Sequence, residues 1–151
     1  NRQTASMNGE PFEEIIKNAA KKVDFLIVSF HWGDEYKTTH NARQENLAHR
    51  AVDNGAKIVI GHHPHVIEDT EVYKDAYIAY SLGNFVFDQT FSAATMEGML
   101  LNIKLGTNGT MSVRKDTVKL NKVFQPDQVI KGKEEKVKFQ EMQATSEQKI
   151  F

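Results

Sequence analysis

Apolar residues at helical spacing alternate with short apolar runs in the first part of the chain. Between residues 11 and 23 the apolar positions repeat as on one face of a helix, with glutamates and lysines on the other face. Residues 24–30 follow as a nearly continuous apolar run, which predicts a central strand covered on both faces. This first pair of segments therefore predicts a surface helix that packs on a sheet.

The same pair of signals repeats further along. Asn41 and Gln44 have the spacing of a capping box, which predicts a helix over about 41–54. Residues 57–61 predict a second buried strand. Helix, strand, helix and strand joined by short connections favour a parallel α/β architecture.

The second half has a different pattern. Two apolar segments flank Lys74-Asp75, and two longer ones surround 106–109, so each pair predicts a hairpin. Residues 1–10 are polar and are interpreted as a linker. From about residue 131 to 151 the chain is a charge-rich tail, for which a marginal helix and a frayed end are equal alternatives. We expect one domain over 1–151.

Composition narrows the classes of partner and ligand. The chain has 151 residues and a formal net charge of −1, which argues against a nucleic-acid partner held by bulk charge. It has no cysteine, so histidine, carboxylate and asparagine remain as metal ligands. No apolar run reaches the length of a membrane span, and the first residue is not Met. We therefore expect a trimmed piece whose membrane anchor lies outside this chain.

Three histidines follow the second predicted strand. His62, His63 and His65 stand directly after Gly61, at the carboxyl end where α/β sheets hold their ligands. Imidazole is the commonest nitrogen ligand of Zn, Mn and Fe, and crowded buried imidazoles would each need a partner. The cluster therefore predicts a metal site. His63 and His65, with Pro64 between them, could serve two adjacent metals.

Other residues are placed to complete such a site. His31 ends the neighbouring predicted strand and is interpreted as a third ligand. Asn84, at a strand-to-loop transition, is interpreted either as a turn residue or as a contact to substrate or to a ligand. Glu35 is a candidate to orient an imidazole, as is Glu71. We expect Trp32, Phe85 and Phe87 to wall the site, and His40 and His49 to be solvated.

Four stretches of the sequence form a set with a fixed order and spacing: FHWGDEY at 30–36, Gln44 with Leu47-Ala48, GHHPHV at 61–66 and YSLGNFVFD at 80–88. Together they resemble the CapA family of bacterial poly-gamma-glutamate capsule biosynthesis proteins. The resemblance covers about residues 24–88. It implies a calcineurin-like metallophosphoesterase fold, an α/β layered β-sandwich with flanking helices and a two-metal site of Mn, Fe or Zn at the strand ends.

The resemblance also implies roles for residues. His31 matches the family's lone histidine ligand, and His63 and His65 match its paired histidines, although His62 could replace His63. His62 otherwise lines the site as the catalytic candidate, and Asn84, Trp32 and Glu35 are assigned to substrate binding. The early aspartates and asparagine of the superfamily have no counterpart before His31. We therefore expect an N-terminally truncated domain that alone binds metal weakly and catalyses little.

Two hypotheses for the parent protein follow. In the first, it is a metal-dependent hydrolase of capsule polyglutamate synthesis or export, anchored at the bacterial cell surface. In the second, it is a non-catalytic, polymer-binding subunit of a membrane-bound synthase. Both imply acidic poly-gamma-glutamate or synthase subunits as partners. A sheet cut from its partner strands would expose edges, which predicts association into a dimer.

Overall fold

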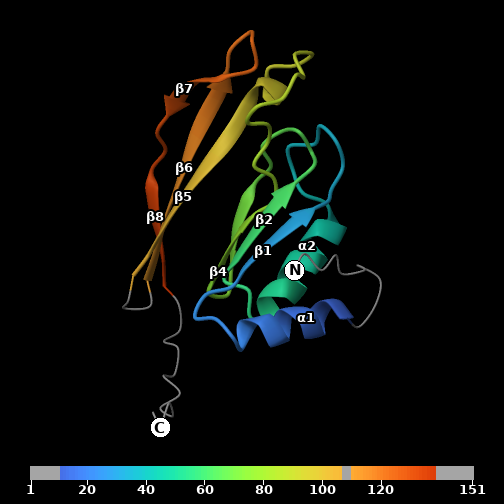
Figure 1. Ribbon diagram of the computed structural model, residues 1–151, viewed down its shortest axis with the longest axis vertical. Helices are drawn as coiled ribbons and strands as arrows, with labels where there is room; N and C mark the ends of the chain where they lie inside the picture. The colour runs from blue at the N-terminus through green and yellow to red at the C-terminus, as the bar shows by residue number, and fades with distance from the viewer. Residues whose placement is uncertain (1–10, 107–109, 139–151) are drawn as a thin grey trace.

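The computed structural model describes residues 11–106 and 110–138, and it arranges them in three layers (Figure 1). Two helices, α1 (Pro11–Ala20) and α2 (Ala42–Asp53), cover one face of a first sheet. A second sheet packs on the opposite face of the first. The predicted α/β class, with layered sheets and flanking helices, is confirmed.

The first sheet consists of β1 (Ile27–His31), β2 (Ile58–His62), β4 (Ala76–Ala79) and β3 (Thr70–Tyr73), in that spatial order. β1 pairs with β2, and β2 with β4, in parallel. β3 and β4 form the predicted antiparallel hairpin around Lys74-Asp75. The carboxyl ends of β1 and β2 therefore meet at one edge of the sheet, as the strand–helix–strand pattern predicts.

The second sheet is antiparallel. β5 (Glu97–Leu105) and β6 (Thr110–Leu120) form its long hairpin, and β7 (Pro126–Ile130) and β8 (Glu134–Lys138) both pair with β6. A short 3-10 helix (Ala94–Met96) precedes β5. The alternatives of a helix or a frayed end from residue 131 are wrong for 134–138, which form a strand. The expected linker 1–10, residues 107–109 of the predicted hairpin turn, and residues 139–151 lie outside the described residues.

Two separate cores hold the layers together. The side chains of a strand alternate between its two faces, so Val59 and Ile78 point toward the helices while Ile58 and Tyr77 point toward the second sheet. The core beneath the helices also contains Phe12, Ile16, Leu47 and Ala51, and the core between the sheets also contains Met111, Val113 and Val137.

The helix boundaries follow from local chemistry. The side chain of Asn41 accepts from the backbone N–H groups of Arg43 and Gln44, and Gln44 returns a bond to the backbone N–H of Asn41, which is the predicted capping box. Gly55 follows α2 with a φ of 112°, a conformation that glycine adopts without strain.

One strand differs from expectation. β1, predicted as a central strand covered on both faces, is the edge strand of its sheet within the described residues, and Ile27 is 53% exposed. A run of apolar residues signals burial but does not specify how many strands pair on each side.

Candidate metal centre

The sheet brings the two predicted ligand segments together. His31 is the last residue of β1 and lies in register with His62, the last residue of β2. Two backbone hydrogen bonds continue this alignment past the strand ends: Trp32 N to His62 O at 3.0 Å, and Tyr36 N to Pro64 O at 2.8 Å. The loop after β1 is therefore fastened along the histidine-bearing turn.

The turn after β2 has an unusual backbone. His63 and His65 have φ angles of 109° and 61°, which lie in a region of backbone conformation that residues other than glycine rarely adopt. Such conformations cost free energy, and they persist where surrounding structure enforces them, often at functional sites. Here the enforced turn places both imidazoles beside the loop after β1.

Three ligand groups converge at this point. The potential ligand atoms of Glu35, His63 and His65 all lie within 4.8 Å of one another. The rings of His31 and His63 are 4.8 Å apart between centroids, so His31 adjoins the same cluster. Two half-buried imidazoles and an exposed carboxylate are a donor set that suits Zn, Mn or Fe. The residues present therefore fit a divalent transition metal.

The geometry distinguishes His63 from His62. His63 joins the cluster with Glu35 and His65, whereas His62 is exposed at the end of β2 and is not part of that cluster. The imidazole of His62 is nevertheless partly desolvated by its surroundings. This loss of hydration, and then the neighbouring His31, lower the pKa of His62. His63 is thus the better placed ligand, and the catalytic role of His62 stays a prediction.

Asn84 contacts one of the ligand candidates. Its side-chain oxygen lies 3.0 Å from Nδ1 of His65, while its amide nitrogen donates to the backbone oxygen of Thr95 at 3.0 Å. Asn84 is buried, so both ends of its amide are fixed within the protein. This position supports orientation of His65, with Nε2 left for a metal. Contact of Asn84 with substrate stays a prediction.

Glu35 was assigned to substrate binding and to orienting an imidazole, and the structure adds a third use. Its carboxylate is close enough to His63 and His65 to be a ligand itself. Sequence reasoning missed this use because Glu35 stands in a polar loop after β1. The backbone bonds that fold this loop over the turn are not visible in the sequence.

Trp32 is buried and lines a cavity of about 300 Å³ next to the histidines. Its indole Nε1 donates to the backbone oxygen of Tyr80 at 2.9 Å, and its ring stacks on Phe30. Trp32 therefore forms a wall, as predicted. The remaining residues around the cavity are His31, Gly33, Asp34, Asn41, Arg43, Gln44 and His63.

Aromatic side chains surround the other side of His65. Phe87 and Tyr36 have ring centroids 4.8 Å and 6.1 Å from that of His65, and Phe91 meets Tyr36 edge-on. Phe87 therefore lies beside the candidate ligand His65 although it is 41% exposed, and Phe85 is more exposed, at 53%.

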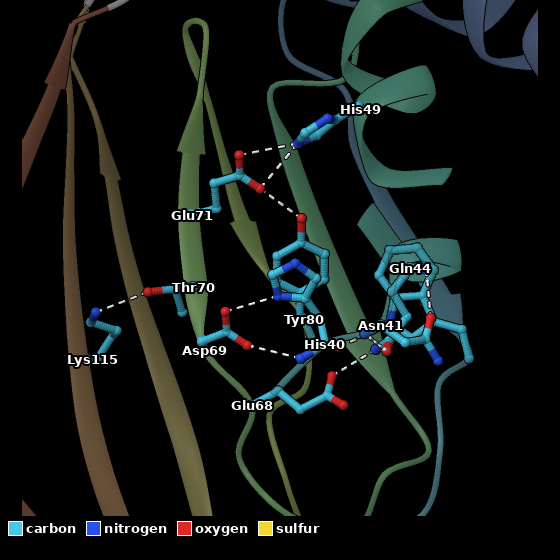
Figure 2. Close-up of polar contacts among 11 residues, drawn as sticks. His40, Asn41, Gln44, His49, Glu68, Asp69, Thr70, Glu71, Tyr80 and Lys115 are labelled. Atoms are coloured by element: carbon cyan, nitrogen blue, oxygen red, sulfur yellow. Dashed lines mark hydrogen bonds and ion pairs between the residues drawn. The ribbon is translucent and has the colours of Figure 1, made fainter. Parts of the chain in front are cut away.

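A buried polar pair, drawn in Figure 2, adjoins the cavity, because Gln44 is one of the residues that line it. Gln44 Nε2 donates to Glu68 Oε2 at 2.6 Å, and both side chains are almost fully buried. Gly33 packs directly on Gln44: a Cβ at position 33 would lie 2.7 Å from Gln44 Nε2. Burial raises the pKa of Glu68, and the bond from Gln44 partly opposes this shift. Gln44 was visible as a capping residue, but its buried partner was not.

His40 and His49 are half-buried and each contacts a carboxylate, with 23% of each side chain exposed, so the expectation of fully solvated side chains is wrong. His40 Nδ1 lies 2.8 Å from Asp69 and its ring stacks on Tyr80. His49 Nε2 lies 3.1 Å from Glu71, and Tyr80 donates to the same carboxylate at 2.6 Å (Figure 2). Glu71 therefore does orient an imidazole, but one that links α2 to β3 rather than one in the candidate metal centre.

Comparison with known proteins bears on the same segment. The family described as "Bacterial capsule synthesis protein PGA_cap" matches residues 1–89. The chain is similar to "PGA biosynthesis protein CapA" of Bacillus subtilis, with 48% identity over 101 residues, covering 67% of this chain and 26% of that protein. "Capsule biosynthesis protein CapA" of Bacillus anthracis is 48% identical over 98 residues, covering 65% and 23%.

A more distant similarity is to a "Probable polyglutamine synthesis accessory protein" of Mycobacterium tuberculosis, 35% identical over 65 residues, covering 43% of this chain and 17% of that protein. The chain spans about a quarter of the length of the two Bacillus relatives. None of the helices in the described part of the chain is long and apolar enough to span a membrane.

Proposed function

Because the chain belongs to the PGA_cap family of bacterial capsule synthesis proteins, we propose that it forms part of a metal-dependent hydrolase that serves capsule poly-gamma-glutamate synthesis or export. The observation that carries this proposal is the convergence of Glu35, His63 and His65 on one point at the strand ends. The capsule names of the two Bacillus relatives supply the biological setting. They also favour a place at the bacterial surface for the parent protein.

In this proposal His63, His65 and Glu35 hold a divalent transition metal, with His31 beside them for a second. A bound metal of this kind polarises an ester or amide oxygen and lowers the pKa of a coordinated water. Glu35 matters because its carboxylate would add a negatively charged ligand to the two neutral imidazoles. The parent would supply the remaining ligands, as the chain spans about a quarter of its relatives.

The protein's own groups shape the site. Asn84 holds Nδ1 of His65 and so fixes the direction of the ring. Buried Trp32 forms part of the wall of the cavity beside His31 and His63. The aromatic side chains around His65 form an apolar margin that a polymer chain could cross.

The test measures hydrolysis of phosphodiester and γ-glutamyl substrates, with Mn²⁺ or Zn²⁺, by this chain and by the full-length CapA-type protein that carries it. We expect activity in the full-length protein only. His63→Gln and His65→Gln should abolish it, and His49→Gln, which removes an imidazole outside the centre, should retain it. If the full-length protein neither retains metal nor hydrolyses either substrate, the enzyme proposal fails and a polymer-binding structural subunit replaces it.

A further inference from the structure

Arg43 occupies a position that stability alone does not favour. It is the second residue of α2, inside the first turn, where the helix dipole favours acidic side chains and opposes cations. Its backbone N–H is bonded to Asn41, but its guanidinium has no hydrogen-bond or ion-pair partner among the residues that the structure describes. Proteins override local preferences of this kind at functional sites, which makes Arg43 a candidate for a role in binding.

Arg43 is one of the residues that line the 300 Å³ cavity, together with His31 and His63. Asp34 also lines this cavity, and its carboxylate accepts from the Asn41 side chain at 2.8 Å. Asp34 is thus engaged with α2's N-cap residue, while the described structure gives Arg43 nothing to bind. The cavity therefore offers a free five-donor cation beside two candidate metal ligands.

The cavity has a fixed floor. Gln44 lines it and is held at both ends of its amide, by the backbone N–H of Asn41 at 2.9 Å and by Glu68 at 2.6 Å (Figure 2). Gly33 closes against Gln44 without room for a side chain. Arg43 is thus the neighbour in α2 of Gln44, which the buried pair with Glu68 fixes in place. The shape of this part of the cavity is therefore set by a helix and not only by loops.

We propose that this cavity is a carboxylate-binding subsite, in which Arg43 receives an α-carboxylate of a γ-linked glutamate chain next to the metal centre. The inference rests on the proposed function for the identity of the polymer. A guanidinium matches a carboxylate through two parallel N–H···O bonds. Every residue of a γ-linked glutamate chain keeps its α-carboxylate free, so the polymer offers such a group at each repeat.

The size of the cavity limits what enters it. At about 300 Å³ it lies at the lower end of small-molecule sites, which suits one residue of the polymer rather than several. The chain would then continue across the aromatic margin near His65. A single arginine would select acidic residues of the polymer by direct contact. Such a contact does not require the whole protein to be positively charged, and its formal net charge is −1.

The experiment measures binding of a γ-linked glutamate pentamer to the 151-residue chain by calorimetry, in EDTA so that no metal takes part. The uncharged pentamer with carboxamides in place of carboxylates, and inorganic phosphate, are the comparison ligands. We expect the acidic pentamer to bind and the carboxamide pentamer to bind at least about tenfold more weakly.

The variants locate the effect. Arg43→Gln should weaken binding of the pentamer about 10- to 100-fold. The affinity of Arg43→Lys should lie between those of the unmodified chain and Arg43→Gln, because lysine keeps the charge but cannot form two parallel hydrogen bonds to a carboxylate. Lys37→Gln is the matched control, since it removes one positive charge from an exposed loop residue that does not line the cavity. It should bind the pentamer as the unmodified chain does.

Three results would overturn the subsite: Arg43→Gln binds the pentamer unchanged, Lys37→Gln weakens binding as much as Arg43→Gln, or only phosphate binds with a dependence on Arg43. A separate metal titration of Arg43→Gln keeps the two proposals apart. Unchanged metal affinity with lost pentamer binding supports the subsite. Pentamer binding that depends on Arg43, in a chain that takes up no metal, would contradict the proposed hydrolase and leave the subsite intact.

Discussion

The side-chain oxygen of Asn84 lies 3.0 Å from Nδ1 of His65, across 19 positions of sequence. An oxygen at this distance accepts the Nδ1 proton and so fixes the tautomer in which Nε2 carries the lone pair. The other end of the Asn84 amide is bonded to Thr95, which prevents the side chain from turning away. The candidate ligand His65 is thus oriented by a loop that follows a different strand.

Replacement of Asn84 should therefore weaken metal binding without removing a ligand. We expect Asn84→Ala to lower the affinity for Zn²⁺ or Mn²⁺ by roughly 10- to 100-fold, as for other residues that orient ligating imidazoles. Titration calorimetry measures the change. Asn46→Ala, on the exposed surface of α2, is the control and should bind metal normally. Equal affinities in the two variants would show that His65 is not oriented by Asn84.

Glu68 should make stability depend on pH. Burial raises its pKa in the folded protein, so the folded state binds this proton more tightly than the unfolded state does. The contribution of Glu68 to the free energy of unfolding is fully present below the pKa that Glu68 has in the unfolded chain. It is lost as the pH rises through the higher pKa of Glu68 in the folded protein. Glu68→Gln keeps an acceptor for Gln44 and cannot ionise.

Urea denaturation at several pH values checks this expectation. As the pH rises above the pKa of Glu68 in the unfolded chain, Glu68→Gln should become more stable relative to the unmodified chain, as measured by the free energy of unfolding. A difference that stays constant from pH 4 to pH 9 would show that Glu68 does not titrate in this way.

Gly61 should tolerate no side chain. A Cβ at this position would lie 1.8 Å from the backbone oxygen of Tyr80 and 2.3 Å from Nε1 of Trp32. Because the nearest atom belongs to the backbone of the neighbouring chain segment, it cannot rotate away. We expect Gly61→Ala to cost about 3 kcal/mol or more, at or above the upper end of overpacking effects. Thermal unfolding measures the loss, and Ser29→Ala, an exposed position on β1, should change stability by less than about 0.5 kcal/mol.

The free edge of β1 predicts self-association of this chain. β1 pairs only with β2 within the described residues, and Ile27 on it is 53% exposed. Unpaired backbone groups on such an edge can pair with a second copy. Light scattering should show a mass that rises with concentration, and Ile27→Lys should reduce the rise. A constant monomer mass at every concentration would refute this prediction.

The sequence predicted the parts of the fold whose signals are local. The capping box at Asn41 and Gln44 and the hairpin at Lys74-Asp75 depend on residues close in sequence, and the structure contains both. β7 and β8 were missed because they are mostly exposed and polar: among the residues of β8, only Val137 is buried. β7 and β8 are held in the sheet by backbone pairing with β6, and this pairing does not require a recognisable pattern of side chains.

The candidate site shows the same division. His31 and His63 could be brought together by reasoning, because His31 ends β1, His63 directly follows β2, and these two strands pair in parallel. The approach of Glu35 to the histidines could not, because it depends on positive φ angles at His63 and His65 and on the bond between Tyr36 and Pro64. The sequence predicts solvated side chains for His40 and His49 because their partners, Asp69 and Glu71, lie more than 20 positions away.

The most direct test of the central claim is a titration of the 151-residue chain with Zn²⁺ and Mn²⁺, combined with elemental analysis after dialysis. The account predicts weak but saturable binding that is lost in His63→Gln and in His65→Gln, lowered in Glu35→Gln, and retained in His49→Gln. If the unmodified chain takes up no metal, or if all four variants bind as it does, then Glu35, His63 and His65 do not form a metal centre.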